Sequence, residues 1–144
     1  MELITKTFKE LTVEELYEML KVRESVFVVE QSCAYQEIDG ADPGALHLFL
    51  KGDDGIIKAY LRVVELDENT ARIGRVLTTE RGRGHGLTIL RAGIAACRDR
   101  MKKKSVYIEA QSYAQGYYEK EGFYPISEEF LEDGIPHIKM MLDF

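Results

Sequence analysis

Short apolar stretches bounded by turn residues recur along the chain, and the first of them, residues 3–8, alternates between apolar and polar positions as a half-buried strand does. Gly-Asp-Asp-Gly at residues 52–55 predicts a hairpin turn between two of these stretches. The pattern therefore predicts an antiparallel meander in the central part of the chain. The expected strands are residues 3–8, 47–51, 56–64, 70–77, 105–110 and a last hairpin at 123–125 and 136–142.

Helical spacing appears first after Thr12, which forms a capping box with Glu15. The apolar residues that follow recur at helical intervals and predict a helix to about Glu24. The next apolar run, residues 26–31, is too short to assign, and it either finishes this helix or begins a second one.

Two more helices are expected in the second half of the chain. One begins after a glycine-rich segment and runs to about Met101. Several basic residues stand at its C-terminal end, and stabilisation by the negative end of the helix dipole explains them better than a contact with nucleic acid does. Because this helix joins two strands, those strands are expected to be parallel. Ser112 is positioned to cap the other helix, at residues 113–121, and Gly122 is positioned to end it.

The chain has 144 residues, so we expect a single domain over residues 1–144. The mixture of strands and helices predicts an α/β fold, with a mixed sheet of six or seven strands flanked by about four helices. No apolar run could span a bilayer and the first residues lack the features of a signal peptide, so the expected location is cytoplasmic, with no membrane partner. The net charge of −6 argues against a nucleic-acid partner, and two cysteines make no disulfide framework.

Residues 81–88, Arg-Gly-Arg-Gly-His-Gly-Leu-Thr, stand between a predicted strand and a predicted helix. Glycine costs roughly 1 kcal/mol against alanine in a helix, so three alternate glycines favour the close approach of a ligand. Backbone N–H groups, a helix N-terminus and two arginines together suit a diphosphate, although a tight turn with no ligand is the alternative. A dinucleotide fingerprint needs a glycine where Leu87 stands, and a P-loop needs Gly-Lys-Ser/Thr, which is absent.

Arg81, Gly84 and Gly86 match the Arg/Gln-x-x-Gly-x-Gly/Ala motif of the GCN5-related N-acetyltransferases (GNAT), which this segment resembles. In that family the loop amides hold the pyrophosphate of acetyl-CoA. A second segment, residues 111–123, resembles the family's block in which a polar amide residue, an alanine, a tyrosine and Gly-Phe recur. The two motifs also have the order and the separation that the family shows.

Further segments narrow this resemblance. Residues 22–31, 35–39, 110–111 and 132–137 look like the ElaA-like branch of the family, whose acceptor is generally not assigned. The Arg-x-x-Val-Phe part of the first segment is also similar to acyl-homoserine lactone synthases, which take acyl groups from acyl carrier protein. Those chains are usually longer and carry tryptophan in this region, whereas this sequence has none.

The resemblance implies the GNAT acyl-CoA N-acyltransferase fold and an N-acetyltransferase activity with acetyl-CoA as cosubstrate and no metal. A primary amine would attack the thioester directly, a backbone N–H near Leu77 would meet the oxyanion, and Tyr118 would protonate the departing thiolate. Residues expected to contact acetyl-CoA are Val76, Leu77, Thr78, Arg81, Gly82, Arg83, Gly84, His85, Gly86, Leu87, Thr88, Gln111 and Tyr118.

The group that takes the proton of the attacking amine is left open by the sequence. Glu37, His47 and His137 are candidates, directly or through water, and each also has a structural explanation. Glu37 belongs to residues 32–45, an acidic loop that either forms a wall of the acceptor site or is simply solvated. A zinc site is disfavoured because no two histidines stand at ligand spacing.

The expected partner is a small-molecule or peptide amine. Neither its identity nor the oligomeric state, a homodimer included, follows from the sequence. Two other functions compete with acetyl transfer: a module that binds acyl-CoA without turnover, and an acyltransferase that uses a longer or carrier-borne acyl group.

Overall fold

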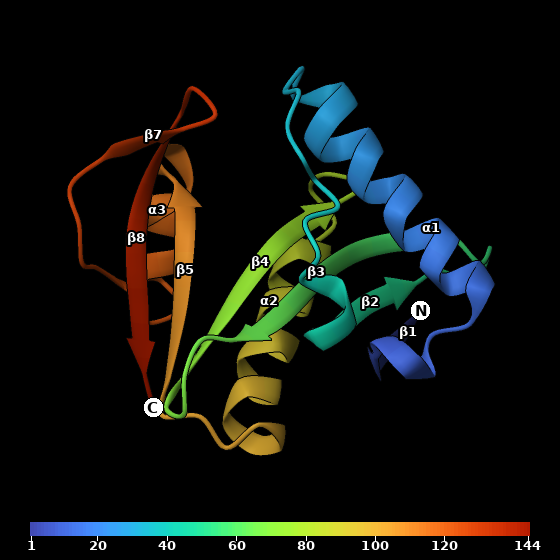
Figure 1. Ribbon diagram of the computed structural model, residues 1–144, viewed down its shortest axis with the longest axis horizontal. Coiled ribbons are helices and arrows are strands. Elements are labelled where there is room, and N and C mark those ends of the chain that lie inside the picture. The colour runs from blue at the N-terminus through green and yellow to red at the C-terminus, as the bar shows by residue number, and fades with distance from the viewer.

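The computed structural model describes all residues 1–144 and contains one eight-stranded mixed sheet with three α-helices. The strands lie in the order β1-β2-β3-β4-β5-β8-β6, and β7 pairs with β8 (Figure 1). The predicted mixed α/β fold is confirmed, with eight strands instead of six or seven and three α-helices instead of about four. The strands are β1 (Glu2–Thr7), β2 (Leu46–Lys51), β3 (Ile57–Glu65), β4 (Thr70–Thr78), β5 (Ser105–Gln111), β6 (Tyr124–Pro125), β7 (Phe130–Glu132) and β8 (Ile135–Asp143), and the helices are α1 (Val13–Arg23), α2 (His85–Ala95) and α3 (Gln115–Glu119).

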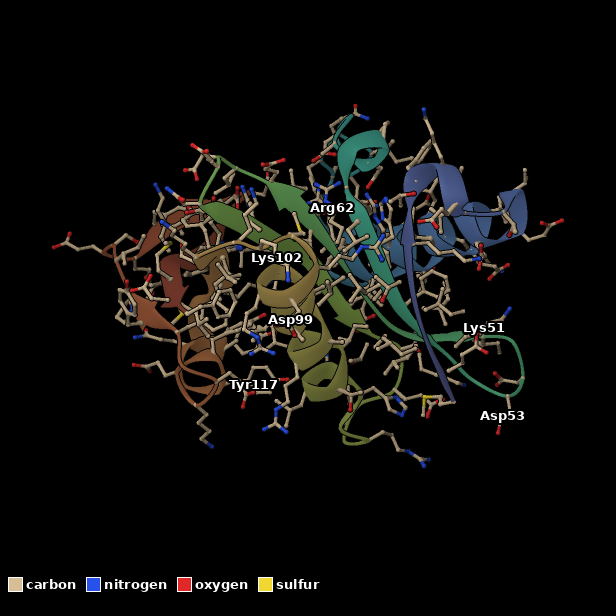
Figure 2. The ribbon with its side chains drawn as sticks, turned by 90° about the horizontal axis from the view of Figure 1, so that it is seen from below. Lys51, Asp53, Arg62, Asp99, Lys102 and Tyr117 are labelled. Atoms are coloured by element: carbon tan, nitrogen blue, oxygen red, sulfur yellow. The ribbon has the colours of Figure 1, made fainter.

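The predicted central meander is confirmed. Strands β2, β3 and β4 pair antiparallel in sequence order, and β1 adds to the outer edge of β2. In the β2–β3 hairpin the N–H of Gly55 donates to the carbonyl of Gly52 at 2.9 Å, and the φ of 82° at Gly55 explains the glycine. Figure 2 shows this hairpin with Lys51 and Asp53 near its tip, at the margin of the molecule.

Strands β4 and β5 are parallel, as the crossover through α2 predicts. They pair at only three positions, the last of which joins Arg72 to Tyr107. Beyond that position the two strands diverge (Figure 1), while β4 remains paired with β3 and β5 with β8. The sheet is therefore split into two halves with a V-shaped opening between them.

Helices cover both faces of the sheet. Helix α2 lies behind the sheet in Figure 1 and packs on the larger core, to which it contributes Ile89 and Leu90. Helix α1 lies in front and covers a smaller core that includes Met19 and Tyr60. Cys97 is fully buried in the larger core, and burial raises the pKa of its thiol to about 12. None of the helices combines the length and apolar character needed to cross a membrane.

The helix boundaries confirm one predicted cap and contradict another. The Thr12 hydroxyl accepts from the Glu15 N–H at 3.1 Å, while the Glu15 carboxylate accepts from the Thr12 N–H at 2.8 Å. The unassigned run after α1 continues that helix in π-helical form, Glu24–Glu30. The cap predicted at Ser112 is wrong, because a 3-10 turn begins there, its hydroxyl has no partner, and α3 starts only at Gln115.

Candidate active site

The opening between β4 and β5 continues as a groove of about 850 Å³, a volume typical of small-molecule and cofactor sites. Its walls come from the facing edges of the two strands, the segments that follow α1, the turn and helix after β5, and the turn between β7 and β8. Side chains that line the groove and could take part in binding or chemistry include Arg62, Arg72, Arg75, Glu109, Gln111, Tyr117, Tyr118 and His137.

Unpaired strand edges form the middle of this groove. Beyond their last shared pair, β4 and β5 no longer bond to each other, so the facing N–H and C=O groups have no partner strand. Val76, Leu77 and Thr78 line the wall of β4, and Gln111 lines the wall of β5. An extended ligand can add to such an edge as an extra strand.

The glycine-rich loop, residues 81–88, joins β4 to α2 at one end of the groove. Gly82 and Gly84 have φ values of 74° and 76°, in the left-handed region that disfavours other residues, so both glycines serve the turn itself. Gly84 is also the N-cap residue of α2, and the Thr88 hydroxyl donates to its carbonyl at 3.1 Å.

Gly86 has a different reason to be glycine. Its backbone is helical, but a Cβ at this position would lie 3.3 Å from Cγ2 of Thr78 and 3.4 Å from the hydroxyl of Tyr117. The residue therefore keeps space open where the loop meets the groove. Residues 85–88 of the loop form the first turn of α2. In this turn Nδ1 of His85 is buried without a hydrogen-bond partner.

Both arginines of the glycine-rich loop reach into solvent. The side chain of Arg81 is 91% exposed and lies 3.5 Å from Glu30, and that of Arg83 is 70% exposed and lies 3.7 Å from Glu80. Exposed pairs at these separations contribute little to stability. The two guanidinium groups are therefore available to an anionic ligand at this end of the groove.

Tyr118 lies on α3 and lines the groove from the C-terminal half of the sheet. Its ring packs edge-on against Phe123 at 5.8 Å and against Tyr117 at 5.4 Å. Burial raises the pKa of Tyr118 to about 12, and no hydrogen bond contributes to that shift. The phenol is therefore protonated at neutral pH and can donate to a ligand.

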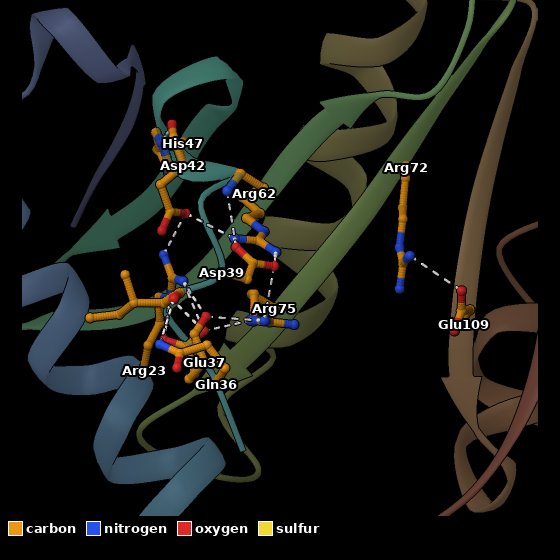
Figure 3. A network of polar contacts seen from close by, with 12 residues as sticks. Arg23, Gln36, Glu37, Asp39, Asp42, His47, Arg62, Arg72, Arg75 and Glu109 are labelled. Atoms are coloured by element: carbon orange, nitrogen blue, oxygen red, sulfur yellow. Dashed lines mark hydrogen bonds and ion pairs between the residues drawn. The ribbon is translucent and has the colours of Figure 1, made fainter. Parts of the chain in front are cut away.

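Glu37 does not stand free in its loop, because its side chain is only 6% exposed. Its carboxylate accepts from Nη2 of Arg23 at 2.8 Å and from Nε of Arg75 at 2.5 Å (Figure 3). Both oxygens of this carboxylate accept from guanidinium groups, and Glu37 does not line the groove. The geometry thus favours a structural role for Glu37.

His47 is fully buried on β2 and does not line the groove. Its Nδ1 lies 2.8 Å from the hydroxyl of Tyr60, and its Nε2 lies 3.0 Å from the carbonyl oxygen of Asp42. Burial lowers the pKa of the imidazole below its usual value. Both ring nitrogens are occupied, so the structural explanation also fits His47 best.

Asp39 and Asp42 take part in the same set of ion pairs as Glu37; Asp42 is buried, whereas the side chain of Asp39 is 33% exposed. Arg62 donates to Asp39 at 2.6 Å and to Asp42 at 3.0 Å, and Arg23 donates to Asp42 at 2.7 Å. The hydrogen bonds from Arg62 hold the pKa of Asp39 well below its usual range. Burial opposes the ionisation of Asp42, but Arg23 and Arg62 still keep its pKa low. We call this set of three guanidinium groups and three carboxylates the ion network: Arg23, Arg62, Arg75, Glu37, Asp39 and Asp42.

His137 lies on β8 opposite Gln111 of β5, and it lines the groove. Its Nδ1 is 2.7 Å from the carbonyl oxygen of Ile135, which can only accept, so Nδ1 carries the proton of the neutral ring. The basic lone pair is then on Nε2, 3.8 Å from a carboxylate oxygen of Glu132. Of the three predicted proton acceptors, His137 is the one that combines a place in the groove with a free basic nitrogen.

Glu109 is a groove residue that the sequence analysis did not single out. It lies on β5 two residues before Gln111, so both side chains are on the same face of the strand. Its carboxylate is 3.2 Å from Nη1 of Arg72 and accepts from the hydroxyl of Tyr107 at 2.9 Å. Strand alternation from Gln111 could have identified it. No group of three or more His, Cys, Asp or Glu side chains is arranged to hold a metal ion.

Comparison with known proteins gives consistent matches. A family model described as an acetyltransferase (GNAT) domain matches residues 6–144. The ElaA protein of Escherichia coli is 40% identical over 136 residues, which cover 91% of this chain and 89% of that protein. Its crystal structure has a TM-score of 0.92 to this chain, with 36% identity and 99% coverage of both chains.

Two further solved structures share the fold. An acyl-CoA N-acyltransferase from Pseudomonas aeruginosa has a TM-score of 0.92 and 38% identity, with 99% of both chains covered. A GNAT family acetyltransferase from Elizabethkingia anophelis, solved with acetyl-CoA bound, has a TM-score of 0.70 and 18% identity, covering 99% of this chain and 97% of that one. The chain belongs to the GNAT acetyltransferase family, and within it the chain is ElaA-like.

Proposed function

We propose that the protein transfers the acetyl group of acetyl-CoA to a primary amine by direct attack in a ternary complex. One observation carries the proposal: the groove of unpaired β4 and β5 edges leads from the glycine-rich loop to the phenol of Tyr118. Membership of the GNAT family supports acyl transfer from CoA. The acetyl group, the amine acceptor and the residue roles are the parts that we propose.

The glycine-rich loop is assigned to the diphosphate of acetyl-CoA. Its backbone N–H groups at the N-terminus of α2 favour an anion, and Arg81 and Arg83 add two cationic donors. Residues 76–78 would pair with the amides of the pantetheine arm, and Gln111 would bond to the same arm from the opposite wall. This arrangement would direct the thioester towards Tyr118.

His137 is assigned to the proton of the acceptor. An amine with a pKa near 10.4 arrives mainly as an ammonium and must lose a proton before it can attack. Nε2 of His137 would accept that proton, directly or through water, and the carboxylate of Glu132 would stabilise the imidazolium that results. The freed lone pair then forms a bond to the thioester carbonyl carbon.

Two groups are assigned to the charges that develop during the transfer. A backbone N–H near Leu77, at the open edge of β4, would donate to the tetrahedral oxyanion. When the C–S bond breaks, the thiolate would take the proton of the Tyr118 hydroxyl. The nitrogen of the tetrahedral intermediate would release its second proton to solvent, and the tyrosinate would regain a proton from solvent. A pKa of about 12 keeps this phenol protonated until the thiolate forms.

Thiol release tests the proposal. Free CoA is measured with acetyl-CoA and a panel of polyamines, aminoglycosides, amino acids and lysine peptides, and mass spectrometry identifies the acetylated product. We expect release that depends on at least one class of amine. CoA binding without release for any amine would indicate a binding module, and a preference for long-chain thioesters would indicate another acyl group. No affinity for CoA in calorimetry would refute the proposal.

A further inference from the structure

Arg75 is held in an uncommon backbone conformation in the middle of β4. Its φ is 55°, in the left-handed region that costs a residue with a side chain roughly 1–2 kcal/mol. The β3–β4 register shifts at this point, since Tyr60 pairs with Leu77 while Arg62 pairs with Gly74. Two residues of β4 therefore lie opposite one residue of β3, which defines a β-bulge.

The side chain of Arg75 is fixed by several contacts at once. Its Nε donates to the Glu37 carboxylate at 2.5 Å, and its Nη2 donates to the Glu37 carbonyl at 3.1 Å and to Asp39 at 3.3 Å. The guanidinium also lies over the ring of Tyr35 at 5.5 Å. These contacts together offset the cost of the left-handed backbone.

Glu37 is itself held from the opposite side. Arg23, which is fully buried, donates to the same carboxylate through Nε at 3.0 Å and Nη2 at 2.8 Å. Figure 3 shows Glu37 between the two guanidinium groups, with Arg23 on α1 and Arg75 on β4. The bulge is therefore connected through one carboxylate to a buried residue of a helix, and it does not depend on the ladder of β4 alone.

We propose that Arg75 is a positioning residue that holds the bulge of β4 so that the amides after it face the groove. A bulge leaves its extra residue outside the ladder, and Val76 and Leu77 line the groove directly after Arg75. The inference rests on the proposed function, because these amides are the donors assigned to the pantetheine arm and the oxyanion. Beyond the proposed function, the inference assigns the orientation of these backbone N–H groups to the side chain of Arg75 in the ion network.

Arg75→Gly separates the positioning of the amides from the stability of the fold. Glycine adopts positive and negative φ values about equally, so it adds no strain but no longer selects the bulged conformation. The pair between Arg23 and Glu37 remains, so the fold is expected to persist. Lys102→Gly is the matched control, because Lys102 also has a left-handed φ, of 57°, and is exposed. Figure 2 shows Lys102 near Asp99, at the turn that follows α2, and it does not line the groove.

Backbone NMR shifts on addition of CoA report on the two ends of the groove separately. In the native chain and in Lys102→Gly, we expect CoA to shift the amide signals of both Val76–Leu77 and Gly84–Gly86. In Arg75→Gly, the shifts at 76–77 should be lost while those at 84–86 remain. Retention of both sets in Arg75→Gly would refute the positioning role and leave the proposed function intact, whereas no shifts in the native chain would refute both.

Turnover gives the second readout. Loss of an oriented oxyanion donor typically lowers kcat by about 100- to 1000-fold, so Arg75→Gly should lose kcat by at least about tenfold. The Kd of CoA should rise by no more than about tenfold, because only hydrogen bonds to the pantetheine arm are lost while the contacts to the diphosphate remain. A kcat within twofold of the native value would overturn the proposal. If Arg75→Gly does not fold, Arg75→Lys decides by the same criteria, because lysine keeps the charge but lacks the planar fork through which Nε and Nη2 of Arg75 contact Glu37 and Asp39.

Discussion

Arg72 of β4 and Glu109 of β5 form an ion pair at 3.2 Å across the point where these strands stop pairing. The guanidinium also lies over the ring of Tyr107 at 5.7 Å, and the Tyr107 hydroxyl donates to the same carboxylate. The pair thus joins the two halves of the sheet at the apex of the groove (Figure 3). It leaves the strand edges beyond it open, which is the condition for a ligand to pair with them.

Replacing Tyr118 with phenylalanine tests the acid of the reaction. The ring and its packing on Phe123 are kept, and only the hydroxyl is lost, so the fold and CoA binding should not change. We expect kcat to fall by about ten- to a thousandfold, as is usual when one acid–base group is removed. Tyr117→Phe is the neighbouring control. Unchanged turnover in Tyr118→Phe would remove this phenol from the mechanism.

The pKa of Tyr118 also makes a prediction about pH. Because burial raises this pKa to about 12, the phenol stays protonated through the range in which enzymes are usually assayed. Activity measured from about pH 8 to 10 should therefore show no loss that belongs to Tyr118. A descending limb in that range that disappears in Tyr118→Phe would contradict the assignment.

His137→Gln tests the proposed base. If an imidazole must be neutral to accept a proton, kcat/KM rises with pH on the acid side of the profile, and this rise is the acid limb. In His137→Gln we expect the acid limb to disappear and the activity to fall by about a hundredfold. Glu132→Gln should lower kcat/KM by a smaller factor, because it removes the carboxylate that lies 3.8 Å from Nε2 of His137. The pH profile of kcat/KM for both variants measures these effects.

His47→Gln is the matched control for that experiment. His47 is buried and bonded through both ring nitrogens, so its replacement should lower the thermal midpoint without moving the acid limb. Glu109→Gln extends the comparison to the other carboxyl group of the groove. If the limb shifts in Glu109→Gln and not in His137→Gln, the base is Glu109 and our assignment is wrong.

Much of the fold follows from local patterns in the sequence. The turn at residues 52–55, the capping box of Thr12 and Glu15, and the strand before the glycine-rich loop are each determined by neighbouring residues, and all three are confirmed. Periodicity does not predict β7, which has only three residues, or the π-helical end of α1. Such short elements depend on the strand or helix beside them more than on their own residues.

The electrostatics of the site were less predictable. The acids of residues 32–45 can be identified in the sequence as a group, but their partners Arg23, Arg62 and Arg75 come from α1, β3 and β4. Only the tertiary fold brings these side chains together, and it converts a candidate base into a buried ion. For the same reason, sequence spacing could not separate His47 from His137, since both lie in strands and only one faces the groove.

Gly86→Ala tests the space at the junction of loop and groove. The added Cβ would press on Thr78 and Tyr117, so we expect the Kd of CoA to rise by about tenfold, or about 1.4 kcal/mol. Alanine is favoured over glycine in a helix, so the thermal midpoint should not fall. Gly44→Ala, where a Cβ meets nothing within 4 Å, is the control for both measurements. An unchanged Kd would show that the ligand does not approach Gly86.

The ion network makes the stability depend on acid pH in a defined direction. In the folded chain the pKa values of Asp39 and Asp42 lie below their unfolded value of about 3.9, so the folded state binds fewer protons. The stabilisation is complete above that value and is lost as the pH falls through it towards the folded pKa. The thermal midpoint of the native chain should therefore drop between about pH 5 and 3, and the difference between native and Asp39→Asn should shrink over the same interval. Asp53→Asn is the control, because the side chain of Asp53 is 99% exposed, and its thermal midpoint should change with pH as that of the native chain does. If the thermal midpoint of Asp39→Asn also runs parallel to the native curve, the ion pairs of Asp39 do not stabilise the fold.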